Sequence, residues 1–198
     1  MLKRLASVIV LLLLAGVGTA CRPYQYHGAL VQPPLPIADF SLPAMDGTEF
    51  RLSDHGEQVI LLYFGYTSCP DVCPATLYQV KQAVEKLGDQ AGEVQVVMVT
   101  VDPERDTPER LTAYLTNINP SFIGLRTTDL AQLDEVMSQF GAYYEIDPNT
   151  SGSAAGYTIS HTASVFVIDR DMSLRLVFPF GTTGEDMADD LSHLLRER

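Results

Sequence analysis

Residues 59–74, VILLYFGYTSCPDVCP, join a strand signal to a helix signal and carry two cysteines at the junction. The first half, residues 59–66, is a continuous apolar run of strand-forming residues, which is typical of a strand buried on both faces. The second half ends at Pro74, and proline is tolerated in the first turn of a helix. This stretch therefore predicts a buried strand that leads into a helix, with Cys69 and Cys73 between them.

Downstream of this stretch, apolar runs and helix signals continue to alternate. Residues 94–101 form a second apolar run and predict another buried strand. The sequence that follows predicts a helix start with Asp106 or Thr107 as the cap and Pro108 in the first turn. This alternation indicates an α/β sandwich with parallel pairs in the central sheet. The remaining predicted elements are helices over 74–88, 129–140 and 183–195, a polar loop over 147–156, and a hairpin formed by 163–169 and 174–178.

Two further segments precede the buried strand. Residues 40–52 contain Asp46-Gly47, a dipeptide that favours a tight turn, and predict a small N-terminal hairpin. Residues 21–37 contain four prolines and predict an extended tether. No domain boundary is evident after residue 37, so residues 38–198 are predicted to form one domain, long enough for its own hydrophobic core.

The N-terminus has the pattern of an export signal. Lys3 and Arg4 precede an apolar run over residues 5–20, which is short for a membrane-spanning helix and suits a signal peptide. Small residues then precede Cys21, as at a bacterial lipoprotein cleavage site, although Gly18 stands where that motif usually has Leu. Lipidation at Cys21, an uncleaved anchor over 1–20 and plain secretion remain open. All three place the domain outside the cytoplasm, facing the periplasm or the cell exterior.

The charge balance excludes one class of partner. The chain has 198 residues, with 13 basic and 25 acidic side chains and a net charge of −12. Nucleic-acid binding needs a basic surface, so no nucleic-acid partner is expected. The chain has only three cysteines, which excludes a small scaffold held together by disulfides.

Cys69 and Cys73 lie where open α/β sheets bind ligands, beyond the carboxyl end of a strand. The partial positive charge of a helix N-terminus favours a thiolate. Four-residue spacing puts both sulfur atoms on one side of a helical turn, so the pair can share a metal ion or form a disulfide, reversible or structural. The spacing differs from the CxxC of thioredoxins, and Leu62 and Tyr66 replace the Pro and Thr of a peroxiredoxin motif.

A metal site would need a third ligand, and the four histidines are the candidates. His27 lies in the tether, His55 near the hairpin turn and His193 in the last helix, where surface positions are expected. His161 differs because it comes just before the apolar strand at 163–169. If that strand lies beside residues 59–66, His161 comes close to the cysteines.

The cysteine segment FGYTSCPDVCP, residues 64–74, resembles the signature of the Sco/SenC family of copper-binding proteins. The resemblance continues at residues 100–108, TVDPERDTP, and at 157–162, YTISHT, and it spans about residues 38–180. It implies a thioredoxin-like fold, a three-layer α/β sandwich with a central mixed sheet and the N-terminal hairpin as an extension.

The same resemblance implies copper, as Cu(I) or Cu(II), bound by Cys69, Cys73 and His161. It also implies membrane tethering and maturation of the dinuclear copper centre of cytochrome c oxidase. The expected partners are the copper-accepting oxidase subunit and another periplasmic copper carrier. The family usually has Asp where this chain has Ser160, which removes a possible carboxylate partner of the ligand. Asp71, between the cysteines, is either an outer group of the site or an exposed acid.

Three functions remain open. A copper chaperone needs His161 as a ligand, whereas a thiol–disulfide oxidoreductase needs only the cysteine pair. A copper or redox sensor that signals by docking is the third. Soft thiolates select Cu(I) and imidazole accepts both oxidation states, although zinc also accepts two Cys and one His.

Overall fold

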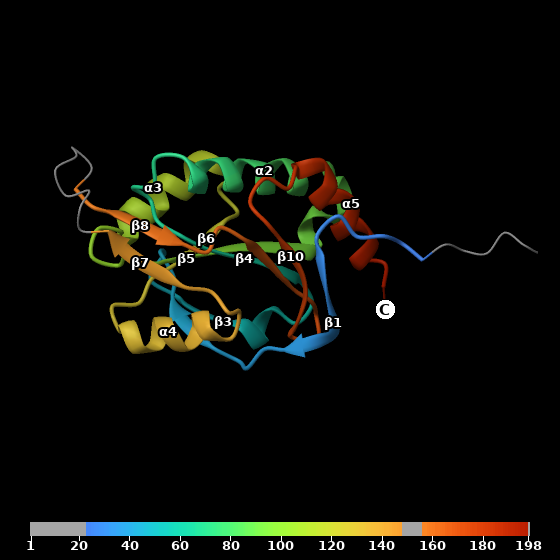
Figure 1. Cartoon of the computed structure of the whole chain (residues 1–198), viewed down its shortest axis with the longest axis horizontal. Helices are drawn as coiled ribbons and strands as arrows, with labels where there is room; N and C mark the ends of the chain where they lie inside the picture. The colour runs from blue at the N-terminus through green and yellow to red at the C-terminus, as the bar shows by residue number, and fades with distance from the viewer. Residues whose placement is uncertain (1–22, 148–155, 198) are drawn as a thin grey trace, which may run out of the picture.

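A six-stranded mixed sheet forms the centre of the computed structural model, which describes residues 23–147 and 156–197 (Figure 1). The strands are Ala29–Pro36 (β1), Ser41–Pro43 (β2), Glu49–Arg51 (β3), Val59–Gly65 (β4), Val94–Thr100 (β5), Ile123–Leu125 (β6), Tyr144–Asp147 (β7), Thr158–His161 (β8), Val165–Ile168 (β9) and Ser173–Phe178 (β10). The α-helices are Val72–Lys86 (α2), Pro108–Ile118 (α3), Leu130–Ser138 (α4) and Gly184–Leu194 (α5), and Leu52–His55 (η1) and Gly88–Glu93 (η2) are 3-10 helices. The strand order is β1-β10-β9-β4-β5-β6. β4, β5 and β6 pair in parallel, whereas β9, β10 and β1 are added antiparallel.

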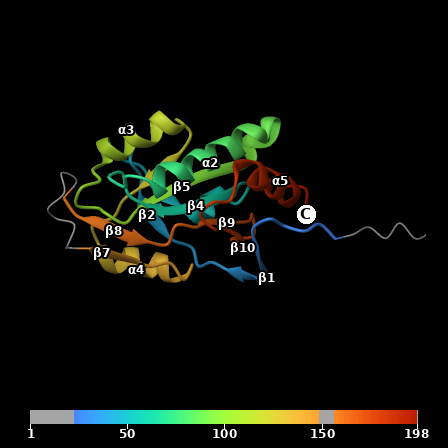
Figure 2. The same ribbon diagram turned by 45° about the horizontal axis from the view of Figure 1, so that its top comes forward.

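The sheet is covered on both faces, which is why every residue of β4 is buried. Side chains alternate between the two faces of a strand. Tyr63 lies against Cys73 at the start of α2, whereas the Phe64 ring packs 5.7 Å from that of Phe140, just after α4. Figures 1 and 2 show α2, α3 and α5 over one face and α4 over the other. The predicted α/β sandwich with parallel pairs is confirmed.

Most helix boundaries follow the capping residues in the sequence. Thr107 caps α3 by accepting a hydrogen bond from the Arg110 amide, and Thr183 caps α5 in the same way. Asp106, the other candidate cap for α3, is fully buried instead. The helix predicted to start near Pro74 begins at Val72, so Cys73 lies in its first turn.

The prediction of a tether over residues 21–37 is wrong in its second half. Residues 29–36 form β1, which pairs antiparallel with β10 at the edge of the sheet. Proline is tolerated on an edge strand because its missing N–H faces solvent. The Pro-rich composition correctly indicates extended backbone, but it carries no information about the strand edge that this backbone covers.

Three short strands, β6, β7 and β8, were not predicted. β6 adds to the far edge of β5, and β7 pairs with β8 as a separate two-stranded sheet. The predicted N-terminal hairpin is present as β2 and β3. Most of the polar loop predicted over 147–156 lies outside the described residues.

The predicted signal peptide or anchor over residues 1–20, and Cys21, also lie outside the described residues. Within the part of the chain that the structure describes, no helix is both long and apolar enough to cross a membrane.

Candidate metal centre

Three side chains from three elements converge at one end of the sheet. Cys69 lies in the loop after β4, Cys73 in the first turn of α2, and His161 is the last residue of β8. One donor atom from each lies within 4.8 Å of the other two. Donors bound about 2.0–2.3 Å from one ion are up to about 4.6 Å apart, so small side-chain movements suffice to close this set around a metal. As predicted, the strand that follows His161, β9, lies beside β4, and this pairing brings His161 close to the cysteines.

The hydrogen bonds of His161 set the tautomer that a metal ligand needs. Its Nδ1 lies 3.1 Å from the carbonyl oxygen of Thr162. A carbonyl can only accept, so Nδ1 carries the proton in this contact. Nε2 then presents its lone pair to the cysteines, 3.3 Å from the Cys73 sulfur.

The two cysteines, both free thiols, have different environments. Cys73 is fully buried, whereas Cys69 is partly exposed and lines an open pocket with His161. A hydrogen bond from the Cys73 thiol and the main-chain N–H groups of Asp71 and Cys73 lower the pKa of Cys69 to about 3. The neighbouring Cys69 and burial raise the pKa of Cys73 well above its usual range. The pair therefore offers an accessible thiolate beside a buried thiol.

The wall behind the cysteines requires a glycine. A Cβ at Gly65 would lie 2.6 Å from a ring carbon of Tyr63 and 3.2 Å from the Cys73 sulfur. The first of these separations is shorter than real contacts allow, so a side chain here would displace the Tyr63 ring, and the second shows that it would also press against the first turn of α2.

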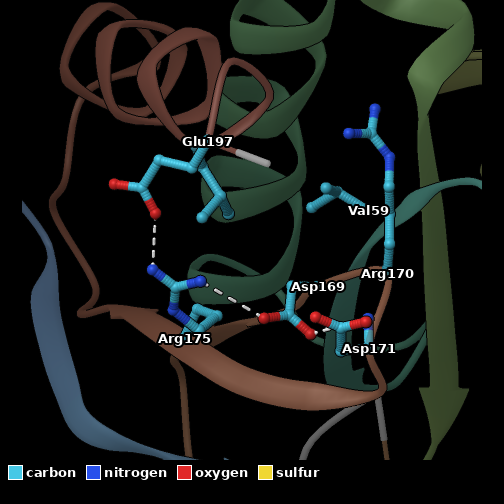
Figure 3. A pocket seen from close by; sticks show the side chains of 7 residues that line it. Val59, Asp169, Arg170, Asp171, Arg175 and Glu197 are labelled. Carbon is cyan, nitrogen blue, oxygen red and sulfur yellow. Dashed lines mark hydrogen bonds and ion pairs between the residues drawn. The ribbon is translucent and has the colours of Figure 1, made fainter.

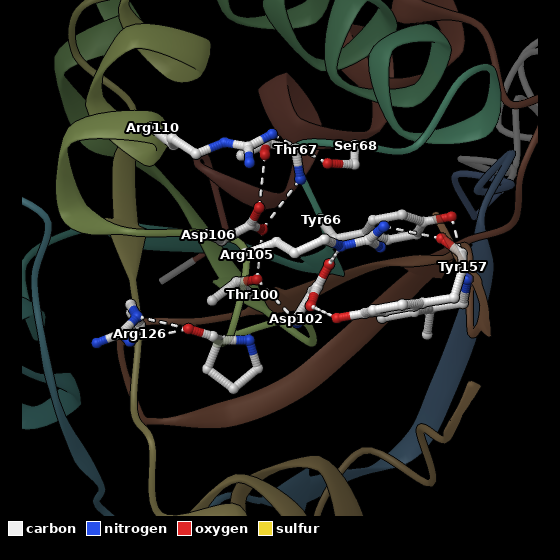
Figure 4. A network of polar contacts seen from close by, with 12 residues as sticks. Tyr66, Thr67, Ser68, Thr100, Asp102, Arg105, Asp106, Arg110, Arg126 and Tyr157 are labelled. Carbon is white, nitrogen blue, oxygen red and sulfur yellow. Dashed lines mark hydrogen bonds and ion pairs between the residues drawn. The ribbon is translucent and has the colours of Figure 1, made fainter. Parts of the chain in front are cut away.

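Asp106, predicted only as a candidate helix cap, has a different role beside the site. Its carboxylate accepts hydrogen bonds from the Thr67 amide at 3.0 Å, the Thr67 hydroxyl at 2.5 Å and the Thr100 hydroxyl at 2.6 Å (Figure 4). Thr67 lies two residues before Cys69, so Asp106 fixes the cysteine loop to the end of β5. The DPERD sequence resembles a helix start, and nothing in its pattern distinguishes a buried aspartate from a cap.

Asp71 and Ser160, whose roles at the site the sequence left open, are both exposed. Asp71 immediately precedes α2, and its side chain makes no capping hydrogen bond. Ser160 is also exposed, and it lines the open pocket that contains Cys69 and His161. The Thr162 carbonyl, rather than a carboxylate at position 160, orients the imidazole.

The other three histidines have different partners. His27 contacts Asp186, His55 stacks on Phe50, and His193 stacks on Tyr24. None of these contacts brings a histidine to the cysteines. His27 is exposed, as predicted, whereas His55 and His193 are half-buried.

A second pocket lies at the opposite end of β4, where Val59 begins the strand (Figure 3). Arg170 of this pocket is paired with Glu93 outside it, and Arg175 is paired with two acidic groups of the pocket itself. Arg175 contacts Asp169 at 3.3 Å and Glu197 at 2.6 Å. These ion pairs join β10 to the end of the chain, so they have a structural role, and the cysteine end remains the candidate functional site.

Comparison with known proteins gives one consistent family. The family described as SCO1/SenC matches residues 31–196. A SCO2-like protein of Rickettsia prowazekii is 32% identical over 174 residues, which cover 83% of this chain and 84% of the relative. Bradyrhizobium japonicum ScoI, solved with copper bound, is 32% identical with a TM-score of 0.71, over 81% of this chain and 99% of that chain. Apo Sco1 of Thermus thermophilus is 35% identical with a TM-score of 0.71, over 88% and 97% of the two chains. The predicted resemblance and the thioredoxin-like fold class are thereby confirmed.

Proposed function

This chain belongs to the SCO1/SenC family, and from that membership we propose that it is a copper chaperone whose ligands are Cys69, Cys73 and His161. The observation that carries the proposal is the convergence of two sulfur atoms and one imidazole nitrogen within 4.8 Å. Two thiolates suit Cu(I), and the nitrogen extends the set to Cu(II). Cys69 is accessible, so a partner can approach the ion and take it by ligand exchange.

The proposed acceptor is the copper-accepting subunit of cytochrome c oxidase, since the family is one of copper-binding proteins linked to assembly of that enzyme. Another copper carrier in the same compartment is the proposed donor. The basic start, the apolar run over 1–20 and Cys21 support tethering to a membrane, with the domain facing the periplasm or the cell exterior. Cell fractionation after a high-salt wash tests the tether, and recovery of the full-length protein in the soluble fraction would argue against it.

Copper titration of the reduced full-length protein tests the ligand set. We expect one copper per chain, and we expect Cys69→Ser or Cys73→Ser to abolish most of the binding because a hydroxyl is a hard, weakly acidic donor. His161→Ala should weaken Cu(II) binding more than Cu(I) binding, because two thiolates alone hold Cu(I) in a linear arrangement.

Two variants serve as matched controls for this titration. Cys21→Ser removes the third thiol of the chain, and His27→Ala removes a half-exposed imidazole paired with Asp186. Both should retain one copper per chain with unchanged affinity. Unchanged Cu(I) and Cu(II) affinity in His161→Ala, together with normal oxidase assembly in cells, would refute the chaperone proposal.

The unequal cysteines favour a second candidate function, the reduction of disulfides in a partner. An accessible thiolate beside a buried thiol suits this chemistry. Cys69 would attack one sulfur of the partner disulfide and release the other as a thiolate, which takes up a proton. Cys73, after losing its proton, would attack Cys69 in the mixed disulfide, which leaves a Cys69–Cys73 disulfide and a fully reduced partner.

His161→Ala separates the two candidate functions, because disulfide exchange needs only the cysteines. A variant that loses oxidase assembly but reduces a model disulfide at the wild-type rate favours the chaperone. A variant that keeps assembly favours the oxidoreductase.

A further inference from the structure

The guanidinium of Arg105 lies between two aromatic rings that belong to opposite sides of the candidate site (Figure 4). It is 3.6 Å from the ring centroid of Tyr157 and 5.7 Å from that of Tyr66. Both distances are within the range of cation–π contacts. Tyr66 belongs to the loop that carries the cysteines, and Tyr157 directly precedes β8, which ends at His161. We refer to Arg105 and these two rings as the Arg105 stack.

Asp102 fixes the stack in one geometry. This buried carboxylate accepts a hydrogen bond from Nε of Arg105 and another from the Tyr157 hydroxyl at 2.6 Å. Arg105 also donates from its terminal nitrogen to the Tyr157 carbonyl oxygen at 2.8 Å. Burial and the Asp102 hydrogen bond raise the pKa of Tyr157 to about 12, so its hydroxyl remains a donor at neutral pH.

The second ring of the stack contacts the histidine itself. Tyr66 packs edge-on against the His161 ring, with centroids 5.8 Å apart. Its hydroxyl oxygen accepts a hydrogen bond from the Ile159 amide at 3.2 Å. β8 is therefore held just before its first residue, through Tyr157, and at its second residue, through Ile159, and both points precede His161.

We propose that the Arg105 stack, locked by Asp102, is a positioning device that sets His161 relative to the two cysteines and thereby controls how strongly the site prefers Cu(II). This inference rests on the proposed copper function. Cu(I) is satisfied by two thiolates, whereas Cu(II) requires further donors that include nitrogen. A displacement of the imidazole alone therefore weakens Cu(II) binding and leaves Cu(I) binding nearly intact.

The same loop provides a matched control. Arg126 donates two hydrogen bonds to the Pro103 carbonyl oxygen, at 3.0 and 2.8 Å, and so supports the loop at a point away from the stack (Figure 4). Arg126 itself directly follows β6, so Arg126→Lys removes a planar fork that supports the loop from outside and leaves the contacts of Arg105 with Tyr66 and Tyr157 in place.

The experiment compares Arg105→Lys, Tyr157→Phe and Arg126→Lys with the wild-type protein. Cu(I) and Cu(II) affinities are measured by competition, and the Cu(II) electron paramagnetic resonance spectrum and the thiolate-to-Cu(II) absorption are recorded. Loss of a partner that orients a ligand typically costs about 10- to 100-fold in metal affinity. We therefore expect Cu(II) affinity to fall about tenfold or more in Arg105→Lys and Tyr157→Phe, with an altered Cu(II) spectrum and a Cu(I) affinity within about threefold of wild type.

A measurement on the copper-free protein makes the test independent of how much copper each variant binds. Imidazole resonances of isotope-labelled His161 should shift or broaden in Tyr157→Phe, which keeps the ring and removes only the hydroxyl, and should be unchanged in Arg126→Lys.

Unchanged Cu(II) affinity, spectrum and His161 resonances in Arg105→Lys and Tyr157→Phe would overturn the inference. Equal losses of Cu(I) and Cu(II) affinity, shared by Arg126→Lys, would also overturn it, because they indicate general loosening of the loop. Failure of the wild-type protein to bind copper would refute the proposed function, and the inference with it. Wild-type binding with unaffected stack variants refutes the inference alone.

Discussion

Replacing Asp106 with alanine should destabilise the domain far more than an ordinary surface substitution. Its carboxylate is fully buried and accepts three hydrogen bonds, from the Thr67 amide, the Thr67 hydroxyl and the Thr100 hydroxyl, at 2.5 to 3.0 Å. Hydrogen bonds to a charged group contribute about 1.5–3 kcal/mol each. The three share one carboxylate and are not additive, so we expect Asp106→Ala to lower the free energy of unfolding by about 3–5 kcal/mol.

Two further variants make this magnitude interpretable. Asp46 also accepts from the amide and hydroxyl of one threonine, Thr48, at 3.0 and 2.6 Å, but it is exposed. Water can replace those contacts, so Asp46→Ala should cost less than about 1 kcal/mol. Asp106→Asn keeps one acceptor oxygen and should cost about 1–2 kcal/mol.

Urea denaturation of the reduced proteins, followed by circular dichroism, measures all three values. A cost below about 1.5 kcal/mol for Asp106→Ala, or one equal to that of Asp46→Ala, would show that burial does not strengthen these hydrogen bonds. Asp106 would then not be the residue that fixes the cysteine loop to β5.

Three other predictions concern other parts of the molecule. Gly65→Ala places a Cβ 2.6 Å from a Tyr63 ring carbon and should lower the melting temperature by several degrees; an unchanged temperature in a thermal scan would contradict the close packing. Because the pKa of Cys69 is lowered to about 3, iodoacetamide should alkylate Cys69 in copper-free protein at about pH 5, where ordinary thiols are protonated. Mass spectrometry should find the buried Cys73 unmodified, and alkylation of Cys69 only above about pH 8 would contradict the thiolate. The buried Asp190 carboxylate accepts hydrogen bonds from two main-chain amides and a tyrosine hydroxyl of the segment before β1. Asp190→Ala should therefore make that segment more sensitive to limited proteolysis. Equal cleavage rates in the variant and the wild-type protein would show that Asp190 does not hold the segment.

Long periodic segments made the central fold predictable from the sequence. β4 and β5 are apolar almost throughout because both faces of the sheet are covered, and a continuous run of strand-forming residues between turn signals is typical of a buried strand. The short strands were not predictable in the same way. β6 has three residues and β7 has four, too few for a periodic pattern, and both are defined by the strands they pair with.

The residues of the candidate site likewise divide into those that the sequence could predict and those that it could not. Cys69 and Cys73 were found because their spacing is local, and His161 because it precedes a strand whose place beside β4 could be anticipated. Asp106 and Arg105 belong to a recognisable motif, but Asp106 was predicted only as a candidate helix cap and Arg105 had no predicted role, because their partners come from other elements. A carboxylate that joins Thr67 to Thr100 has no signature along the chain, since only the folded sheet brings those threonines together.

The separation of 88 positions along the chain between Cys73 and His161 links metal binding to folding. The cysteine pair is local and remains available in an unfolded chain, whereas the imidazole joins it only after the sheet has formed. A ligand specific to the folded state stabilises that state by about 2.7 kcal/mol at a concentration of 100 Kd, and binding to the unfolded chain subtracts from this gain. Cu(I), held by two thiolates, should therefore stabilise the fold little. Cu(II), which needs the third donor, should stabilise it more, so the melting temperature of the protein would report the oxidation state of the ion it carries.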